Sequence, residues 1–352
     1  MTGNGEELPT ATVYEVAARA GVSIATVSRT FSDSSKVAAR TREAVLEAAQ
    51  DLQYVPAAAA RALAGRRTRA LGAVLPHIDG HYYAQLLVGF EVAASELGLS
   101  VVLALASPDG VRSTAALDLL GRVDGVAFMA PSGADDAFVA RVAGVRPTVT
   151  VARGQVEGAE AIHAENREPA RELTAHLLSH GRRRLGFVGR PEEGSDIAGR
   201  HRGCLEALRA EGLELVRLHE ADPVEEAGRE VAERILRGPL DVDALVCGND
   251  ELALAVVSRL VEGGVRVPED VAVTGWDDTV AARYLTPGLT TVHQDVAELG
   301  ALAARHLAAR IDGEAALEPV TVESRAVLRA SCGCATSRGP AARGHPTTPH
   351  DP

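Results

Sequence analysis

The chain has 352 residues, of which 46% are hydrophobic and only 3% aromatic, and its formal net charge is −12. This length suits two or three domains, with cores built mainly of alanine, valine and leucine. No apolar run reaches the length of a membrane span, and residues 1–11 lack the basic start and apolar stretch of a secretory signal. The sequence therefore predicts a cytoplasmic protein with no membrane partner.

The charge is unevenly distributed along the chain. Residues 12–69 carry nine lysines and arginines but only five acidic residues, a net charge of +4 that leaves −16 on the rest. A basic segment on an acidic body keeps the attraction for phosphate groups local. The distribution favours a DNA-binding segment near the N-terminal end.

Residues 12–29 predict two short helices joined by a tight turn. Thr12 and Glu15 have the spacing of a capping box, and apolar residues recur at three- and four-residue spacing over residues 13–20. Gly21 can adopt a positive φ at the turn, and Ser23 is a candidate cap for the second helix. This pattern is typical of a helix-turn-helix.

The second of these helices is predicted to read DNA. Small and hydrogen-bonding side chains with one arginine suit the major groove, where arginine can bond bidentately to guanine. The residues expected on its outward side are Ile24, Ala25, Thr26, Ser28 and Arg29. The alternative is a small helical hairpin whose outer residues are simply solvated.

A third helix is predicted over residues 41–52, and Pro56 ends it because proline restricts the preceding residue to extended geometry. Residues 57–64 follow, with good helix propensity but too few residues for a helix that is stable alone in water. Two interpretations stay open for this segment: a hinge helix that forms only when something holds it, or a plain linker.

From Arg69 onwards, short apolar runs alternate with helical segments. Near-continuous apolar strands separated by helices form parallel, doubly wound sheets, and about 260 residues of this pattern suit two lobes. The predicted strands include 71–76, 100–105, 125–128, 148–151, 185–189, 244–247 and 271–275, and the predicted helices include 83–97, 169–180, 200–211 and 225–236. The Pro/Gly/Thr-rich tail after Cys334 is expected to be disordered.

The four cysteines, Cys204, Cys247, Cys332 and Cys334, are few and unevenly spread, which fits a reducing compartment. The Cys332-Gly333-Cys334 stretch has the form of half a metal site. Because no second Cys/His pair stands near it in the sequence at ligand spacing, we expect no metal and no cofactor.

Four motifs together resemble the lactose-repressor family of bacterial transcription regulators. They are TVYEVA at 12–17 with AGVSIATVSR at 20–29; TREAV at 41–45 with LQYVP at 52–56 and ARAL at 60–63; GNDELA at 248–253 with VTGWDD at 273–278; and LTTVHQD at 289–295. Their order and spacing are similar to that family over roughly residues 12–334. The resemblance implies a repressor that binds operator DNA as a homodimer.

The resemblance also implies a domain organisation. A helix-turn-helix head at 12–56 follows a flexible N-terminus at 1–11, and a hinge at 57–68 leads to an effector domain at 69–334 and the tail at 335–352. The effector domain is expected to resemble periplasmic sugar-binding proteins, with three crossovers near 164–167, 291–296 and 320–324. Its ligand, expected to be a sugar, is held between the two lobes.

Residue roles carried over from the family follow these motifs. The expected DNA contacts are the five outward residues above together with Thr41, Tyr54, Arg61 and Leu63, with Leu63 as a minor-groove wedge. The expected effector contacts are Tyr82, Tyr83, Arg200, Asn249, Trp276, Asp277 and Gln294. The chain departs from the family at Ala38, where a capping serine is usual, at Ala57, which is usually asparagine, and at Ala152, an aspartate in many sugar-binding members.

Some roles also have a competing explanation. Asn249 and Asp277 follow predicted strands, where ligands of open α/β sheets bind, but Asp277 and Asp278 also fit a surface turn. Trp276 suits either stacking on a sugar or packing in the core. Tyr82 and Tyr83 suit either contact with the ligand or packing at the start of a helix.

Two other classes of function compete with a regulator. A transport-type solute-binding protein would explain residues 70–330 but not the basic head or the missing export signal. An enzyme would need a catalytic motif, and no P-loop, G-x-S-x-G or G-x-G-x-x-G follows a predicted strand. The sequence therefore predicts no catalytic residue. The sequence leaves open which effector binds, whether the effector acts as an inducer or a corepressor, which operator is bound, and whether the protein is a dimer or a tetramer.

Overall fold

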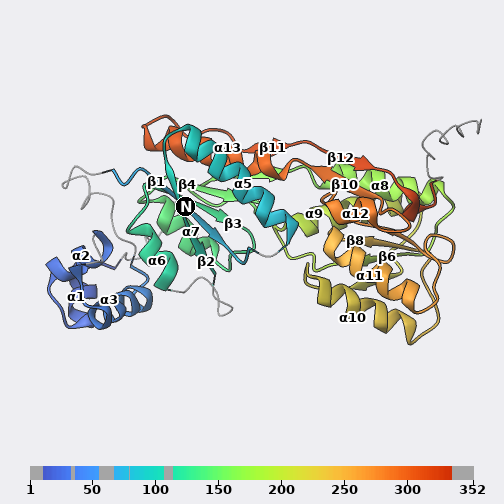
Figure 1. The fold of residues 1–352 in the computed structure, drawn as a ribbon, viewed down its shortest axis with the longest axis horizontal. Coiled ribbons are helices and arrows are strands. Elements are labelled where there is room, and N and C mark those ends of the chain that lie inside the picture. The colour runs from blue at the N-terminus through green and yellow to red at the C-terminus, as the bar shows by residue number, and fades with distance from the viewer. Residues whose placement is uncertain (1–10, 33–35, 55–66, 79, 107–113, 335–352) are drawn as a thin grey trace, which may run out of the picture. The chain divides into compact units, whose positions relative to one another are not determined.

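The computed structural model describes residues 11–32, 36–54, 67–78, 80–106 and 114–334 (Figure 1). Internal contacts divide the chain into two compact units. The first unit comprises Met1–Glu172, Arg190–Ala207 and His293–Arg325, and the second comprises Leu173–Gly189, Leu208–Val292 and Ala326–Pro352. The domain boundaries and crossovers expected from the sequence remain a prediction.

Three short helices form the head: α1 (Val13–Ala20), α2 (Ile24–Ser32) and α3 (Ala39–Asp51). Each helix contributes fully buried apolar side chains, with Val16, Val27, Val45 and Ala49 all at 0% exposure. The spacing of apolar residues therefore predicts this small core correctly, because residues three and four apart share one helix face.

The first unit contains a six-stranded parallel sheet with the strand order β11-β5-β4-β3-β1-β2. The strands are β1 (Ala70–Leu75), β2 (Ser100–Leu105), β3 (Gly125–Met129), β4 (Thr148–Val151), β5 (Glu160–Ala164) and β11 (Val320–Val322). Every residue of β1, β3 and β4 is buried, as expected for central strands of a sheet covered on both faces.

Helices cover both faces of this sheet. Leu71, Ala73 and Leu75 of β1 pack with α5 (His81–Glu96) and α13 (Val296–Ile311). Val74 points to the opposite face and packs with residues of α6 (Thr114–Leu120) and α7 (Asp136–Ala143). Alternate side chains of one strand thus enter separate cores, the arrangement of a doubly wound sheet.

Helices α5 and α13 approach each other through paired glycines. A Cβ atom added at Gly300 would lie 2.0 Å from the backbone oxygen of Leu86, and one added at Gly89 would lie 1.8 Å from that of Ala297. Neither distance is compatible with a side chain, so both positions require glycine if the two backbones are to stay this close.

The second unit contains a four-stranded parallel sheet with the order β7-β6-β8-β9. Its strands are β6 (Leu185–Val188), β7 (Arg217–His219), β8 (Ala244–Cys247) and β9 (Ala272–Thr274). Two helices, α10 (Glu225–Leu236) and α11 (Asp250–Glu262), pack together and share one core with these strands. The short helix α12 (Val280–Tyr284) and the 3₁₀ turn η2 (Ala330–Cys332) complete the unit.

Four further elements contain residues of both units. These are α8 (Arg167–Ser179), α9 (Asp196–Ala210), and the paired strands β10 (Thr291–Gln294) and β12 (Ser324–Val327).

The structure confirms the predicted fold class, a helical head followed by parallel α/β sheets. Strands β5, β7, β10, β11 and β12 are not among the predicted strands. The predicted hinge helix at 57–64 and the tail at 335–352 lie outside the described residues. Within the part of the chain that the structure describes, no helix is long and apolar enough to cross a membrane.

Candidate DNA-reading helix and effector-binding residues

The start of the head is fixed by a reciprocal capping box. The backbone nitrogen of Thr12 donates to Glu15 Oε2 over 2.6 Å, and the Glu15 nitrogen donates to Thr12 Oγ1 over 3.4 Å. The Thr12 hydroxyl also donates to Glu15 Oε2 over 2.8 Å, and the backbone and hydroxyl bonds from Thr12 hold the pKa of Glu15 below its ordinary value. Gly21 adopts φ 67° at the end of α1, the left-handed conformation predicted for the turn.

Helix α2 begins at a side-chain cap and exposes one face. The Thr26 nitrogen donates to Ser23 Oγ over 3.2 Å, as the sequence predicts. Val27 and Phe31 are buried, so the face that carries them is held against the rest of the head. The opposite face is exposed and carries Ile24, Ala25, Ser28 and Arg29.

The other predicted DNA contacts lie in different settings. Thr26 is half-buried, and its hydroxyl lies 2.9 Å from that of Ser23. Thr41 is half-buried on the first turn of α3, and the half-buried Tyr54 packs its ring against Phe31 with centroids 6.1 Å apart. Arg61 and Leu63 lie outside the described residues. The structure thus groups four of these side chains on one helix face.

In the second unit, two predicted effector contacts follow neighbouring parallel strands. Asn249 comes two residues after β8 and Asp277 three residues after β9, and these strands pair in parallel with Ala244 opposite Ala272. The carboxyl ends of both strands therefore lie at the same edge of the sheet, the edge where open α/β sheets bind ligands.

Asn249 also has a structural role. Its Oδ1 accepts from the Leu252 nitrogen over 3.0 Å and caps α11, and its Nδ2 donates to the Pro223 oxygen over 3.1 Å. An amide group has two donors and two acceptor lone pairs, and these bonds account for one of each. The same side chain can therefore cap the helix and bond a ligand.

Asp277 and Asp278 both adopt positive φ, at 110° and 52°. Such a backbone is costly for a residue other than glycine and persists only where its surroundings hold it. Asp278 is held by ion pairs with Arg329 at 2.5 Å and Arg283 at 3.4 Å. The Asp277 nitrogen donates to the Val292 oxygen over 2.8 Å, and its side chain is buried.

Asp250, which the sequence motif contains but whose role the sequence analysis missed, organises this loop. Its Oδ2 accepts from the nitrogen and hydroxyl of Thr279 over 2.8 and 3.0 Å, and its Oδ1 accepts from the Thr291 hydroxyl over 2.7 Å. Burial raises the pKa of Asp250 to about 6, and these hydrogen bonds partly oppose that shift. A buried carboxylate that ties residues of the loop together positions them for a ligand.

In the first unit, Arg200 is buried on α9, and two polar side chains fix its orientation. Its Nε donates to Asn166 Oδ1 over 2.8 Å, and its guanidinium lies 3.6 Å from Asp196. Burial raises the pKa of Asp196, and the nearby Arg200 lowers it in turn. Asn166 was not predicted, because it lies 34 residues from Arg200 and belongs to no recognised motif.

The aromatic candidates and Gln294 are mostly covered. Tyr83 is 9% exposed and donates its hydroxyl to the Ala130 oxygen over 2.9 Å, and the ring of the half-buried Tyr82 stands edge-on to it at 5.2 Å. Trp276 and Gln294 are each 2% exposed. The burial of Trp276 supports core packing over ligand stacking, and its predicted effector contact stays a prediction.

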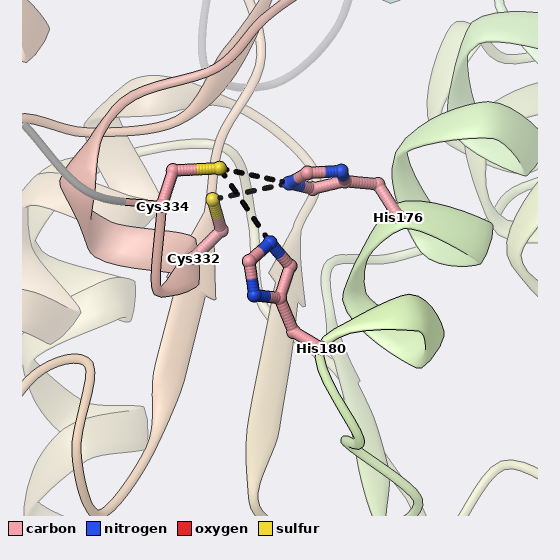
Figure 2. Close-up of side chains that lie close together, drawn as sticks. All are labelled: His176, His180, Cys332 and Cys334. Carbon is pink, nitrogen blue, oxygen red and sulfur yellow. Dashed lines mark hydrogen bonds between the residues drawn. The ribbon is translucent and has the colours of Figure 1, made fainter. Parts of the chain in front are cut away.

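Cys332 and Cys334 have no second Cys/His pair near them in the sequence, but the fold brings one to them. His176 and His180, four residues apart on and just after α8, face both cysteines (Figure 2). One ligand atom from each of the four residues lies within 4.8 Å of the others. Burial, then the neighbouring His180, lowers the pKa of His176.

The chain matches two described families. Residues 12–57 match the bacterial regulatory proteins of the lacI family, and residues 174–332 match a periplasmic binding protein-like domain. The chain is 35% identical to the HTH-type transcriptional regulator CelR of Thermobifida fusca over 91% of this chain and 98% of that protein. It is 33% identical to the HTH-type transcriptional repressor PurR of Erwinia tasmaniensis over 86% and 90% of the two proteins.

Solved structures of regulators also resemble this chain over most of its length. A CelR–cellobiose complex aligns with a TM-score of 0.67 and 32% identity over 91% of this chain and 99% of that one. The lac repressor dimer bound to operator and the anti-inducer ONPF aligns with a TM-score of 0.69 and 28% identity over 92% and 99%.

Proposed function

The chain belongs to the lacI family of bacterial regulatory proteins, and from this premise we propose which of its residues read the operator and which hold the effector. It is a DNA-binding transcription regulator controlled by a small molecule, and not an enzyme. We propose that it represses as a homodimer, that each α2 enters one half of an operator, and that the effector is a sugar.

The exposed face of α2 carries the DNA-reading part of the proposal. Ile24, Ala25, Ser28 and Arg29 are exposed while Val27 and Phe31 anchor the helix from behind. The two small side chains let the helix come close to the bases, the apolar Ile24 can contact a thymine methyl group, and Arg29 can bond bidentately to guanine.

The sugar part of the proposal is supported by the polar groups at the carboxyl ends of β8 and β9. A carboxylate accepts hydrogen bonds from neighbouring hydroxyls, and the Asn249 amide both donates and accepts. Arg200 of the first unit supplies a buried donor set, and CelR, a relative over nearly its full length, was solved with cellobiose. We therefore assign Asp277, Asn249 and Arg200 to the effector, with Tyr82, Tyr83, Trp276 and Gln294 as further candidates.

A mobility-shift titration tests the DNA-reading assignment. An operator is first selected from random duplexes, and wild-type protein is compared with Arg29→Ala on the selected site and on a scrambled duplex. Loss of the bidentate bond is expected to cost about 1–3 kcal/mol per half-site on the selected duplex only. Arg19→Ala is the control, because Arg19 pairs with Asp51 away from α2. Equal weakening on both duplexes would show that Arg29 touches only phosphate.

A further inference from the structure

The four side chains that meet between α8 and the C-terminal segment have the separations of a metal-ligand set. His176 Nε2 lies 3.4 Å from Cys332 Sγ and 3.3 Å from Cys334 Sγ, and His180 Nε2 lies 3.5 Å from Cys334 Sγ. With ordinary zinc–sulfur and zinc–nitrogen bond lengths, a tetrahedral site separates sulfur from nitrogen by about 3.5 Å. These three separations match such a site, and because all four ligand atoms lie within 4.8 Å of one another, a modest inward movement of the remaining pairs completes it.

The local backbone explains why the ligand atoms converge. Two histidines four residues apart lie on one side of a helical turn, and the His180 nitrogen continues that turn by donating to the Leu177 oxygen over 3.1 Å. Gly333 adopts φ 105° between the cysteines, a conformation that strains other residues, and this turn brings both sulfurs to the same side (Figure 2).

The cysteine side of the cluster is held independently of any metal. The Ser331 hydroxyl donates to the Val273 oxygen over 2.6 Å and accepts from the Thr290 nitrogen over 2.8 Å. Cys332 is 0% exposed and its Sγ lies 3.2 Å from the Arg329 oxygen. This anchoring places Cys332 before an ion arrives, which lowers the ordering cost of binding.

We propose that His176, His180, Cys332 and Cys334 bind one zinc ion in a closed structural site. Two imidazoles and two thiolates in a tetrahedral arrangement are a common zinc ligand set. Two thiolates also neutralise the charge of Zn²⁺, which suits a partly buried position. Four protein ligands leave no position open for water, so the site holds the fold together and supplies no catalysis.

The ion joins chain segments that are far apart in sequence. His176 and Cys332 both belong to the second unit but are 156 residues apart in sequence, so the bound metal closes a long loop of the chain. A cross-link over a long loop restricts the unfolded chain most strongly, and metal binding to the folded state adds its free energy to folding. The zinc would hold the segment that carries Arg329 against α8.

Metal content and cobalt substitution test the proposal on the full-length protein. Apoprotein prepared with a chelator under reducing conditions is dialysed against Zn²⁺ and, separately, Co²⁺. One equivalent of zinc per chain and the intense visible and near-ultraviolet bands of tetrahedral cobalt–thiolate are expected. Zinc content no higher than in a Cys332→Ser/Cys334→Ser variant would overturn the proposal.

Single substitutions separate binding from folding. His180 is exposed, so His180→Ala leaves the core intact while it removes one ligand. Since losing an outer-shell partner already costs about 10–100-fold in metal affinity, losing a direct ligand should cost about 100-fold or more. His81 is half-buried and lies outside the cluster. The His81→Ala variant is therefore the control and should bind zinc with wild-type affinity.

Thermal unfolding gives a readout independent of spectroscopy. Chelator should lower the Tm of wild type and of His81→Ala by several degrees and leave the Tm of His180→Ala unchanged. An identical chelator effect in wild type and His180→Ala would overturn the proposal. A Cys332–Cys334 disulfide that persists in reductant would also overturn it, because a disulfide supplies no thiolates.

Discussion

Arg329 forms an ion pair at 2.5 Å with Asp278, the residue directly after the proposed effector contact Asp277. The Arg329 guanidinium also donates to the Leu289 oxygen over 2.8 Å, and the Arg329 nitrogen donates to Thr290 Oγ1 over 2.8 Å. The C-terminal segment thus holds a loop whose two aspartates both adopt positive φ. We infer that this contact stabilises the strained backbone that presents the Asp277 carboxylate.

Removing Arg329 should therefore destabilise the second unit. Arg329→Ala leaves the Asp278 carboxylate, only 8% exposed, without its closer cation, which should cost about 3 kcal/mol in the free energy of unfolding. Arg283→Ala is the matched control: Arg283 pairs with the same carboxylate at 3.4 Å but is 56% exposed, so its loss should cost less than about 1 kcal/mol. Urea unfolding of both variants is the measurement, and equal costs would refute this ranking.

Two helices of the head, α1 and α2, have side-chain caps and α3 has none, and this difference can be tested in both directions. Helix α3 begins after Ala38, which makes no side-chain cap bond, whereas α1 begins at the Thr12 capping box. Ala38→Ser should stabilise the head by about 1 kcal/mol, and Thr12→Ala should destabilise it by a similar amount. Amide exchange across residues 39–51 and 13–20 of the full chain reports each change. Faster exchange in Ala38→Ser would contradict the expected gain.

The buried Asp250 predicts a pH dependence of stability. Burial raises its pKa from 3.8 to about 6, so between these values the folded protein retains a proton that the unfolded chain has released. Stability falls as pH rises wherever the folded state binds more protons. The free energy of unfolding should therefore decrease from pH 3.8 to about 6, by roughly 3 kcal/mol if this group acts alone.

Asp250→Asn isolates that contribution, because asparagine keeps the shape and one acceptor but does not titrate. The difference in unfolding free energy between wild type and variant should shrink or reverse across this pH window. Asp270→Asn is the control: Asp270 pairs with Arg266, which lowers its pKa to about 2, so between pH 3.8 and 6 it adds only a small slope of the opposite sign. A wild-type-minus-Asp250→Asn difference that does not change with pH would rule out Asp250 as the titrating group.

The parts of the fold that follow from local pattern were predictable from sequence. Strands β4 and β8 coincide with their predicted ranges, because β8 is a fully apolar run and β4 alternates threonine with valine, both of which favour strands. Strand β5, by contrast, contains a buried Glu160 whose partners are distant in sequence: His306 at 2.7 Å, 146 residues along the chain, and Arg310 at 3.4 Å. Strands β7 (RLH) and β12 (SRAV) contain charged and polar residues and so form no apolar run, and the three-residue β11 is half-exposed at the sheet edge.

The site residues also could be predicted only where local sequence pattern places them. Asn249 and Asp277 could be placed because each lies within three residues of the carboxyl end of a strand, the edge where open α/β sheets bind ligands. The partners Asn166 of Arg200 and Arg329 of Asp278 could not, because side-chain pairing across tens of residues depends on tertiary packing. The two histidines, His176 and His180, have a recognisable spacing, and so do the two cysteines, Cys332 and Cys334. Nothing in the sequence indicates that the two pairs meet.

The proposed role of Asp277 predicts a reciprocal coupling between effector and operator. A sugar ligand is first identified by thermal shift among mono- and disaccharides. Operator DNA should change the affinity for this sugar by some factor, and the sugar should change the affinity for operator DNA by the same factor. This equality follows from linkage, and a ligand can shift the DNA equilibrium only through its different affinities for the two forms. Calorimetric titration with and without operator, together with mobility shifts at saturating sugar, measures both factors.

Asp277→Asn is a sharp test of the residue, because asparagine also tolerates positive φ and the substitution removes only the charge. We expect it to weaken sugar binding by about 1.5–3 kcal/mol, the usual worth of a hydrogen bond to a charged group, while operator affinity without sugar stays at the wild-type value. Asp241→Asn is the control, since Asp241 precedes the amino end of β8 and pairs with Arg217. Unchanged sugar affinity in Asp277→Asn would remove this carboxylate from the effector site, because the loop that carries it would still be intact.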